Sequence, residues 1–148
     1  METDRPGVIA PPPAIFLIPF LIGYLCRDLL PRIGSPVIGS VLAVAGLGIG
    51  AWAFVTMLRA RTNIDPYKPA TTVVSTGPYR FSRNPIYVAM TFLYAGAALS
   101  FRIIPALILL PIALLLLQFG VIRREERYLE AKFGDRYREY RSRVRRWT

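Results

Sequence analysis

Four long apolar runs dominate this chain and constrain its fold more than any other feature. They cover residues 14–30, 36–58, 86–101 and 103–122. Crossing the hydrocarbon core of a bilayer takes about 20 helical residues, so runs near this length predict membrane-spanning helices. The hydrophobic share of 53% is also more than a soluble domain of 148 residues needs. We therefore expect a single all-α membrane domain, residues 1–148, with about four transmembrane helices.

The chain reverses between the last two apolar runs and changes character after the fourth. Arg102 and Pro105 mark a tight reversal, which predicts that these two runs form a helical hairpin. From Arg123 onward the chain is basic, with apolar residues at helical spacing. We expect one C-terminal amphipathic helix on the membrane surface, weakened at Gly134. Its apolar face would hold Leu129, Phe133, Tyr137, Tyr140, Val144 and Trp147.

The charged residues narrow the classes of partner. The net charge is +10, but the basic residues flank apolar runs and no nucleic-acid-binding motif accompanies them. We therefore expect the membrane bilayer, with its anionic lipid headgroups, as the partner and no nucleic acid. The chain has no histidine and one cysteine, so the sequence suggests no metal site and excludes an internal disulfide.

The distribution of basic residues predicts the topology. If all four runs span the membrane, the N-terminus, the loop 59–85 and the C-terminal tail share one side and carry 1, 5 and 10 basic residues. The other side carries Arg27, Arg32 and Arg102. The side richer in arginine and lysine is cytoplasmic in most membrane proteins. We expect a multi-pass integral membrane protein with its N- and C-termini in the cytoplasm.

Residues 72–87 form a polar segment between two apolar runs. Gly77-Pro78 is a turn signal, and Pro85 suits the first turn of a helix, where no amide donor is needed. Arg80 and Arg83 lie in this segment, at the start of the third apolar run. Free backbone amides and a helix N-terminus there would favour an anionic ligand. Alternatively, the two arginines anchor the helix end against lipid phosphates.

The same segment opens a longer motif. Gly77, Tyr79, Arg83, Pro85 and Tyr87 are followed about forty residues later by two glutamates and a spaced aromatic tail. Over roughly residues 60–147 this pattern resembles the isoprenylcysteine carboxyl methyltransferase and phospholipid methyltransferase superfamily of integral-membrane enzymes. The second half of the motif comprises Glu125, Glu126, Leu129, Phe133, Gly134, Tyr137 and Tyr140.

The resemblance implies an enzyme that transfers a methyl group from S-adenosylmethionine. The cofactor-binding region would be 72–147, with Glu125 or Glu126 on the cofactor's amino or ribose groups. We favour Glu126 slightly, because it lies three residues before Leu129 on the apolar face. No catalytic residue is assigned, since methyl transfer chiefly requires alignment of donor and acceptor. By resemblance the cofactor-binding residues are Thr72, Val73, Val74, Tyr79, Arg83, Asn84, Pro85, Tyr87, Glu125 and Glu126.

Two departures from the family pattern bear on the acceptor. Asn84 stands where many members have histidine, so a titrating base is absent at that position. Residues 119–122 read Phe-Gly-Val-Ile, without the arginine that holds the substrate carboxylate in the prenylcysteine enzymes. The acceptor could be a prenylcysteine carboxylate, a phospholipid amine or a small thiol, and the missing arginine disfavours the first.

Two other functional classes stay open at this point. The chain could be a non-catalytic four-helix membrane scaffold or lipid-binding protein, whose basic tail only docks on anionic headgroups. It could also be a reductase related to the membrane sterol reductases, with a nicotinamide cofactor. The short chain makes the reductase the least favoured of the three.

Overall fold

The computed structural model describes residues 6–147, which fold into helices joined by turns and loops, with no strand among them. This confirms the all-α prediction. In chain order the elements are α1 (Pro12–Leu25), α2 (Pro36–Arg59), the 3-10 helix η1 (Gly77–Arg80), α3 (Pro85–Ser100), α4 (Ile104–Leu117), the π-helical turn η2 (Gln118–Ile122), α5 (Arg123–Phe133) and α6 (Asp135–Arg143).

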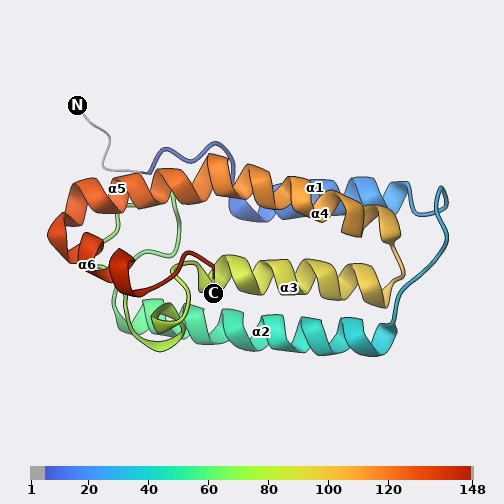
Figure 1. Ribbon diagram of the computed structural model, residues 1–148, viewed down its shortest axis with the longest axis horizontal. Helices are drawn as coiled ribbons and strands as arrows, with labels where there is room; N and C mark the ends of the chain where they lie inside the picture. The colour runs from blue at the N-terminus through green and yellow to red at the C-terminus, as the bar shows by residue number, and fades with distance from the viewer. Residues whose placement is uncertain (1–5, 148) are drawn as a thin grey trace.

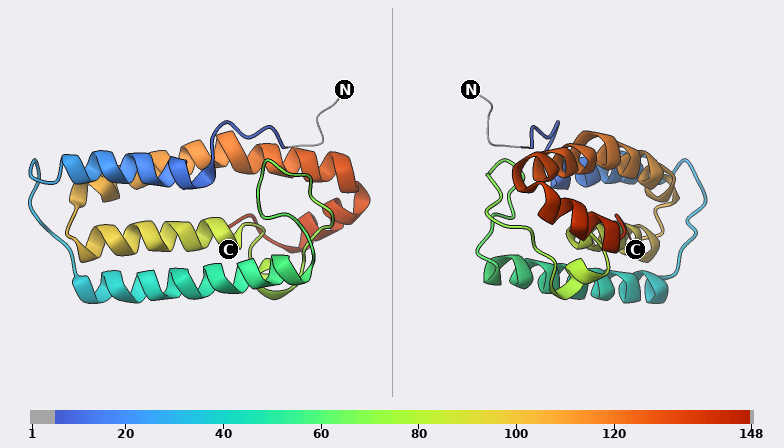
Figure 2. Two further views of the ribbon diagram at one scale, coloured as in Figure 1. Left: turned by 180° about the vertical axis from the view of Figure 1, so that it is seen from behind. Right: turned by 60° about the vertical axis from the view of Figure 1, so that its left-hand side comes forward.

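The first four α-helices run side by side along the long axis of the molecule (Figure 1). Helix α3 lies between α2 on one side and α1 with α4 on the other. Helix α5 continues α4 beyond the other helices, and α6 folds back beneath it. The long loop 60–76, the start of α3 and the C-terminal tail therefore gather at one end of the bundle (Figure 2).

At the opposite end, the α1–α2 and α3–α4 connections lie against each other. Gly34 is next to Leu99 and Arg102. Arg102 adopts a φ of 57°, which reverses the chain between α3 and α4, so the predicted hairpin is confirmed. The basic residues of these two connections thus lie far from the loop 60–76.

Among the described residues, two helices are long and apolar enough to cross a membrane: α2 and the continuous helix Ile104–Phe133. Helices α1 and α3 are shorter apolar helices of 14 and 16 residues. The predicted first run, 14–30, is wrong at both ends, since the helix covers Pro12–Leu25. It stops because Asp28 pairs with Arg27 and Arg32, and because Pro31 disfavours helical backbone at the preceding residue.

Small residues let the helices approach closely. Gly39 and Gly96 face each other across α2 and α3, where an added Cβ would collide with the opposite backbone. Gly23 of α1 lies in the same way against Ala106 of α4. Such contacts are typical of helices packed within a membrane. Much of the outer surface is apolar as well, with Leu25 and Val37 more than 70% exposed.

The prediction of one C-terminal surface helix is wrong. Gly134 has a φ of 54°, a conformation that glycine adopts without a Cβ clash, and it separates α5 from α6. The residues of the predicted apolar face therefore lie on two helices that pack against each other. Tyr137 and Tyr140 of α6 pack with Leu129 of α5 and with Ala53 of α2 in one cluster. Arg5, which contributes to the predicted charge asymmetry, lies outside the described residues.

Candidate functional site

A cavity of about 470 Å³ lies at the end of the bundle where the long loop and the tail meet. Its walls come from α2, the loop after it, the start of α3, and α5 with α6. All ten residues predicted to bind a cofactor line this cavity, although their role stays a prediction. They are Thr72, Val73, Val74, Tyr79, Arg83, Asn84, Pro85, Tyr87, Glu125 and Glu126.

The Gly77-Pro78 turn forms as predicted and fixes one wall of the cavity. Gly77 has a φ of 57°, and a Cβ there would lie 2.6 Å from the Thr56 hydroxyl oxygen of α2. Pro85 is the first residue of α3, also as predicted. The carbonyl oxygen of Tyr79 accepts a 2.8 Å hydrogen bond from the Tyr140 hydroxyl, which ties this turn to α6.

Most backbone amides around the start of α3 have acceptors within the chain. The Arg83 amide donates to the Arg145 carbonyl at 2.9 Å, and the Asn84 amide to the Ser82 hydroxyl at 3.1 Å. The Tyr87 amide donates to the Asn84 carbonyl at 3.0 Å. The expected anion site of free amides therefore stays a prediction, and most of the donors available to a ligand here belong to side chains.

Residues 144–147, the C-terminal strap, are hydrogen-bonded to the segment that leads into α3. The Arg146 carbonyl accepts hydrogen bonds from the Asn84 side-chain amide at 2.8 Å and from the Ser82 hydroxyl at 3.2 Å. The Trp147 indole donates to Gln118 Oε1 of the π-helical turn at 3.1 Å. The side chain that replaces the family histidine, Asn84, therefore holds the strap in place.

Glu126 is neutralised by two arginines. Its carboxylate accepts a bidentate pair of hydrogen bonds from Arg146, at 2.9 and 2.7 Å, and its Oε1 lies 3.1 Å from Arg83 Nη1. The Glu126 side chain is 11% exposed. The sequence preference for Glu126 over Glu125 assumed that one of them faces the site, whereas both line the cavity. Both carboxylate oxygens of Glu126 bind Arg146 and so hold the strap in place.

Within residues 6–147, Glu125 forms no ion pair, in contrast to Glu126. Its Oε1 accepts a 2.8 Å hydrogen bond from the Tyr87 hydroxyl. Burial raises the pKa of Glu125 to about 7, the Tyr87 hydrogen bond opposes that rise, and the negative charge of Glu126 adds to it. Burial also raises the pKa of Tyr79 and of Tyr140, so both phenols stay protonated near neutral pH.

Two side-chain nitrogens of Arg83 are buried and donate no hydrogen bond. Its side chain is 9% exposed, and its Nε and Nη1 are buried without a hydrogen bond, although Nη1 is within ion-pair distance of Glu126. Buried guanidinium nitrogens are normally satisfied. The cavity therefore combines buried cationic donors with the Glu125 carboxyl group, whose pKa of about 7 leaves it partly ionised at neutral pH. This pair is suited to a ligand that carries both an acidic and an amino group.

Two features at the cavity were not assigned a cofactor-binding role from the sequence. One is the loop between α2 and residue 72, where Asp65 accepts a 2.9 Å hydrogen bond from the Tyr67 amide and the Ala70 amide donates to the Tyr128 hydroxyl at 3.1 Å. The other is the ion pair of Arg146 with Glu126. The loop shows only general turn composition, and Arg146 is one of many arginines in the tail, so neither carries a distinctive signal.

Comparisons with known proteins now bear on this cavity. The family model for phospholipid methyltransferase matches residues 35–136. The chain belongs to the phospholipid methyltransferase family. An uncharacterized protein of Haemophilus influenzae is 69% identical over 26 residues, which is 18% of this chain and 41% of that relative. The chain thus spans about two fifths of that relative's length. No solved structure matches the chain.

Membership of the phospholipid methyltransferase family confirms the resemblance and has functional consequences. As its name states, this family comprises enzymes that transfer a methyl group to a phospholipid. The matched segment includes η1, the start of α3 and both glutamates, which form the cavity walls. The family match and the cavity therefore fall on the same part of the chain.

Proposed function

We propose that this protein transfers a methyl group from S-adenosylmethionine to the amine of a phospholipid headgroup in the cavity. One observation carries the proposal: buried Arg83 nitrogens without hydrogen bonds and the unpaired Glu125 carboxylate line the same cavity. The methionine part of the cofactor carries a carboxylate and an ammonium group, which match these two side chains. The family match supports the same cofactor.

In this proposal, Arg83 holds the cofactor's carboxylate and Glu125 its amino or ribose groups. The Tyr87 hydroxyl orients Glu125 by its hydrogen bond. Val73, Val74 and Pro85 supply apolar surface for the rest of the cofactor. When bound, S-adenosylmethionine supplies an activated methyl group on a sulfonium, so the protein's part is to align the acceptor and exclude water.

The charges around the cavity favour an amine over a carboxylate as acceptor. Arg83 and Arg146 both face Glu126, and Lys68, a further cation on the cavity wall, is exposed to solvent. In this proposal Arg83 already holds the cofactor's carboxylate and Arg146 pairs with Glu126, so no arginine of the described cavity wall is left for a prenylcysteine carboxylate. A neutral amine needs no such counter-charge. The described part of the chain therefore fits a phospholipid amine better than a prenylcysteine carboxylate.

We further propose that the acceptor enters from the bilayer between α1 and α2. These helices lie on opposite sides of α3 (Figure 1), and the cavity extends between them along apolar side chains. Pro12 and Pro13 come from α1, Met57 from α2, and Ile86 and Met90 from α3. An acyl chain lying on these residues would leave the headgroup near the polar half of the cavity.

We also propose that α1 to α4 all span the membrane, with the cavity at the cytoplasmic face. Helices of 14 and 16 residues rise about 21 and 24 Å, against about 30 Å of hydrocarbon. Local thinning of the bilayer accommodates such mismatch at modest cost. The basic residues gathered at the cavity end support the cytoplasmic orientation.

The proposal is tested by methyl transfer from radiolabelled S-adenosylmethionine with the protein in phospholipid nanodiscs. The acceptors are phosphatidylethanolamine, a farnesylcysteine, a small thiol and lipid-free ethanolamine. We expect labelled phosphatidylethanolamine, with a rate at least about tenfold lower for Glu125→Gln than for the wild type. Transfer to farnesylcysteine alone would overturn the amine acceptor. Equal rates for lipid-free ethanolamine and the phospholipid would overturn entry from the bilayer.

A further inference from the structure

A second depression lies between α3 and α4 and shares no lining residue with the cavity. It is a groove of about 640 Å³, with walls that include Phe92 of α3 and Pro111 and Leu115 of α4. Gln118 and Trp147 also line it, where the π-helical turn meets the C-terminal strap. The strap thus contributes Arg146 to the Glu126 ion pair at the cavity and Trp147 to the groove.

The groove is suited to hydrocarbon. The hydroxyl of Thr91, which lines it, donates to the Tyr87 carbonyl at 2.8 Å, and Gln118 Oε1 accepts the Trp147 indole hydrogen bond. Its other lining residues are apolar. Leu115 is 57% exposed and lies on a helix that is long and apolar enough to cross a membrane. The groove therefore opens on a surface that faces lipid chains.

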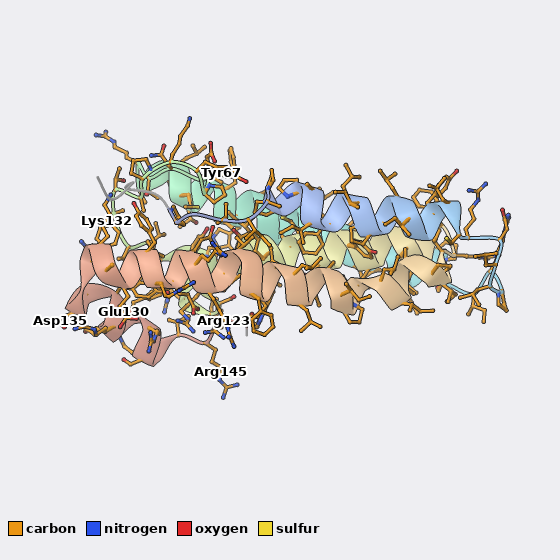
Figure 3. The ribbon with its side chains drawn as sticks, turned by 90° about the horizontal axis from the view of Figure 1, so that it is seen from above. Tyr67, Arg123, Glu130, Lys132, Asp135 and Arg145 are labelled. Carbon is orange, nitrogen blue, oxygen red and sulfur yellow. The ribbon has the colours of Figure 1, made fainter. Side chains whose placement is uncertain are left out.

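Two arginines lie near the end of the groove formed by Gln118 and Trp147. The Arg123 guanidinium stacks over the ring of Phe119, with Cζ 4.3 Å from the ring centroid, which places its charge one turn from Leu115. Arg145 is exposed and belongs to the same strap as Trp147. In Figure 3 both arginines point to the same side of the molecule at a similar position along its length.

Arg123 and Arg145 belong to the tail arginines that form no ion pair within the described residues, as do Arg124, Arg127 and Arg136. Arg141 pairs with Glu130, and Arg146 with Glu126. Within residues 6–147, neither Arg123 nor Arg145 forms an ion pair. Their charges are therefore available to bind an anion. A lipid whose acyl chain lies in the groove would have its headgroup next to them.

We propose that this groove binds an anionic phospholipid, with an acyl chain between α3 and α4 and the phosphate held by Arg123 and Arg145. The site goes beyond the proposed methyl transfer, because it is separate from the cavity and requires neither the cofactor nor the reaction. An arginine near an anionic headgroup contributes about fivefold in affinity. The pair therefore predicts a preference on the order of tenfold for phosphatidylglycerol over phosphatidylcholine.

Trp147 reports directly on the groove. In a Trp52→Phe background it is the single tryptophan, and bromine atoms on a nearby acyl chain quench its emission. The protein is placed in two membranes of identical mixed composition, with dibrominated chains either on phosphatidylglycerol or on phosphatidylcholine. We expect quenching by phosphatidylglycerol several times greater than its share of the lipids predicts. Quenching in proportion to bulk composition, or none by either lipid, would overturn the site.

Charge variants separate this site from general attraction to the membrane. In Arg123→Gln/Arg145→Gln, the preference for brominated phosphatidylglycerol should disappear. The matched variant Arg59→Gln/Arg136→Gln removes two exposed charges elsewhere and should retain it. Equal loss in both variants would show that bulk surface charge attracts the lipid, and would contradict the proposal. If the Arg123→Gln/Arg145→Gln variant does not fold, the two brominated lipids are compared in protein that retains both arginines. That comparison alone supports or overturns the site.

Discussion

Replacing Glu125 with glutamine should stabilise the cofactor-free protein at alkaline pH. The pKa of this carboxyl rises from its ordinary value of 4.5 to about 7, mainly through burial, while the charge of Glu126 adds and the Tyr87 hydrogen bond opposes. Each pKa unit corresponds to about 1.4 kcal/mol, so ionised Glu125 costs the folded state about 3 kcal/mol. Glutamine has a similar shape and never carries this charge.

The sign follows from proton binding. Between pH 4.5 and about 7 the folded protein retains a proton that the unfolded chain has released, so stability falls as pH rises. The stabilisation by protonated Glu125 is complete below the pKa of this carboxyl in the unfolded chain. It is lost as the pH rises through the pKa of the same carboxyl in the folded protein. Glu125→Gln should therefore match the wild type at about pH 4 and exceed it in free energy of unfolding by about 3 kcal/mol at about pH 8.

Thermal unfolding of the detergent-purified protein, followed by tryptophan fluorescence, measures this difference. We expect a melting temperature that is equal at about pH 4 and higher for Glu125→Gln at about pH 8. The matched control Glu139→Gln alters an exposed ion pair with Arg143 and should change stability by less than about 1 kcal/mol. A difference that does not vary with pH, or a less stable variant at about pH 8, would refute the reasoning.

Three further predictions concern the packing around the cavity, and a fourth concerns the topology. Arg146→Ala removes the bidentate partner of buried Glu126 and should lower the free energy of unfolding by about 2 kcal/mol, measured by thermal unfolding. An unchanged melting temperature would contradict a stabilising role of the Arg146–Glu126 ion pair. Gly77→Ala forces a positive φ and a contact with α2, so we expect a loss of about 2 kcal/mol, and a neutral result would contradict the turn geometry. Met90→Trp should raise KM for a long-chain acceptor several-fold while cofactor affinity stays constant, and a loss of cofactor affinity alone would contradict the entry route. The single cysteine, Cys26, lies at the opposite end from the cavity, and a membrane-impermeant maleimide should label it only from the non-cytoplasmic side; labelling from the cytoplasm would reverse the proposed topology.

The sequence was informative where a local pattern determines structure. The apolar runs predicted the positions of α1 to α4, because burial of apolar surface in lipid depends on composition along a short segment. Gly77 and Pro85 predicted the turn and the start of α3, since backbone conformation at such residues is a local property. The resemblance supplied ten cavity residues whose roles stay predictions until binding is measured.

The features that the sequence did not predict depend on contacts between distant segments. The roles of Glu125 and Glu126 differ because Arg146, twenty residues later, pairs with one and not the other. No periodic pattern marks that arginine among the many in the tail. The break at Gly134 also resists prediction, because a glycine within a helical pattern is tolerated in one fold and ends the helix in another.

The central claim is that the cavity binds S-adenosylmethionine through Glu125. Calorimetric titration of the detergent-purified protein with S-adenosylmethionine and S-adenosylhomocysteine tests it directly, with Glu125→Gln as the variant and Glu139→Gln as the control. We expect saturable binding to the wild type and the control, and at least about tenfold weaker binding to Glu125→Gln, because a hydrogen bond to a charged group is lost. No binding to folded wild-type protein, or equal affinity in all three, would contradict the account.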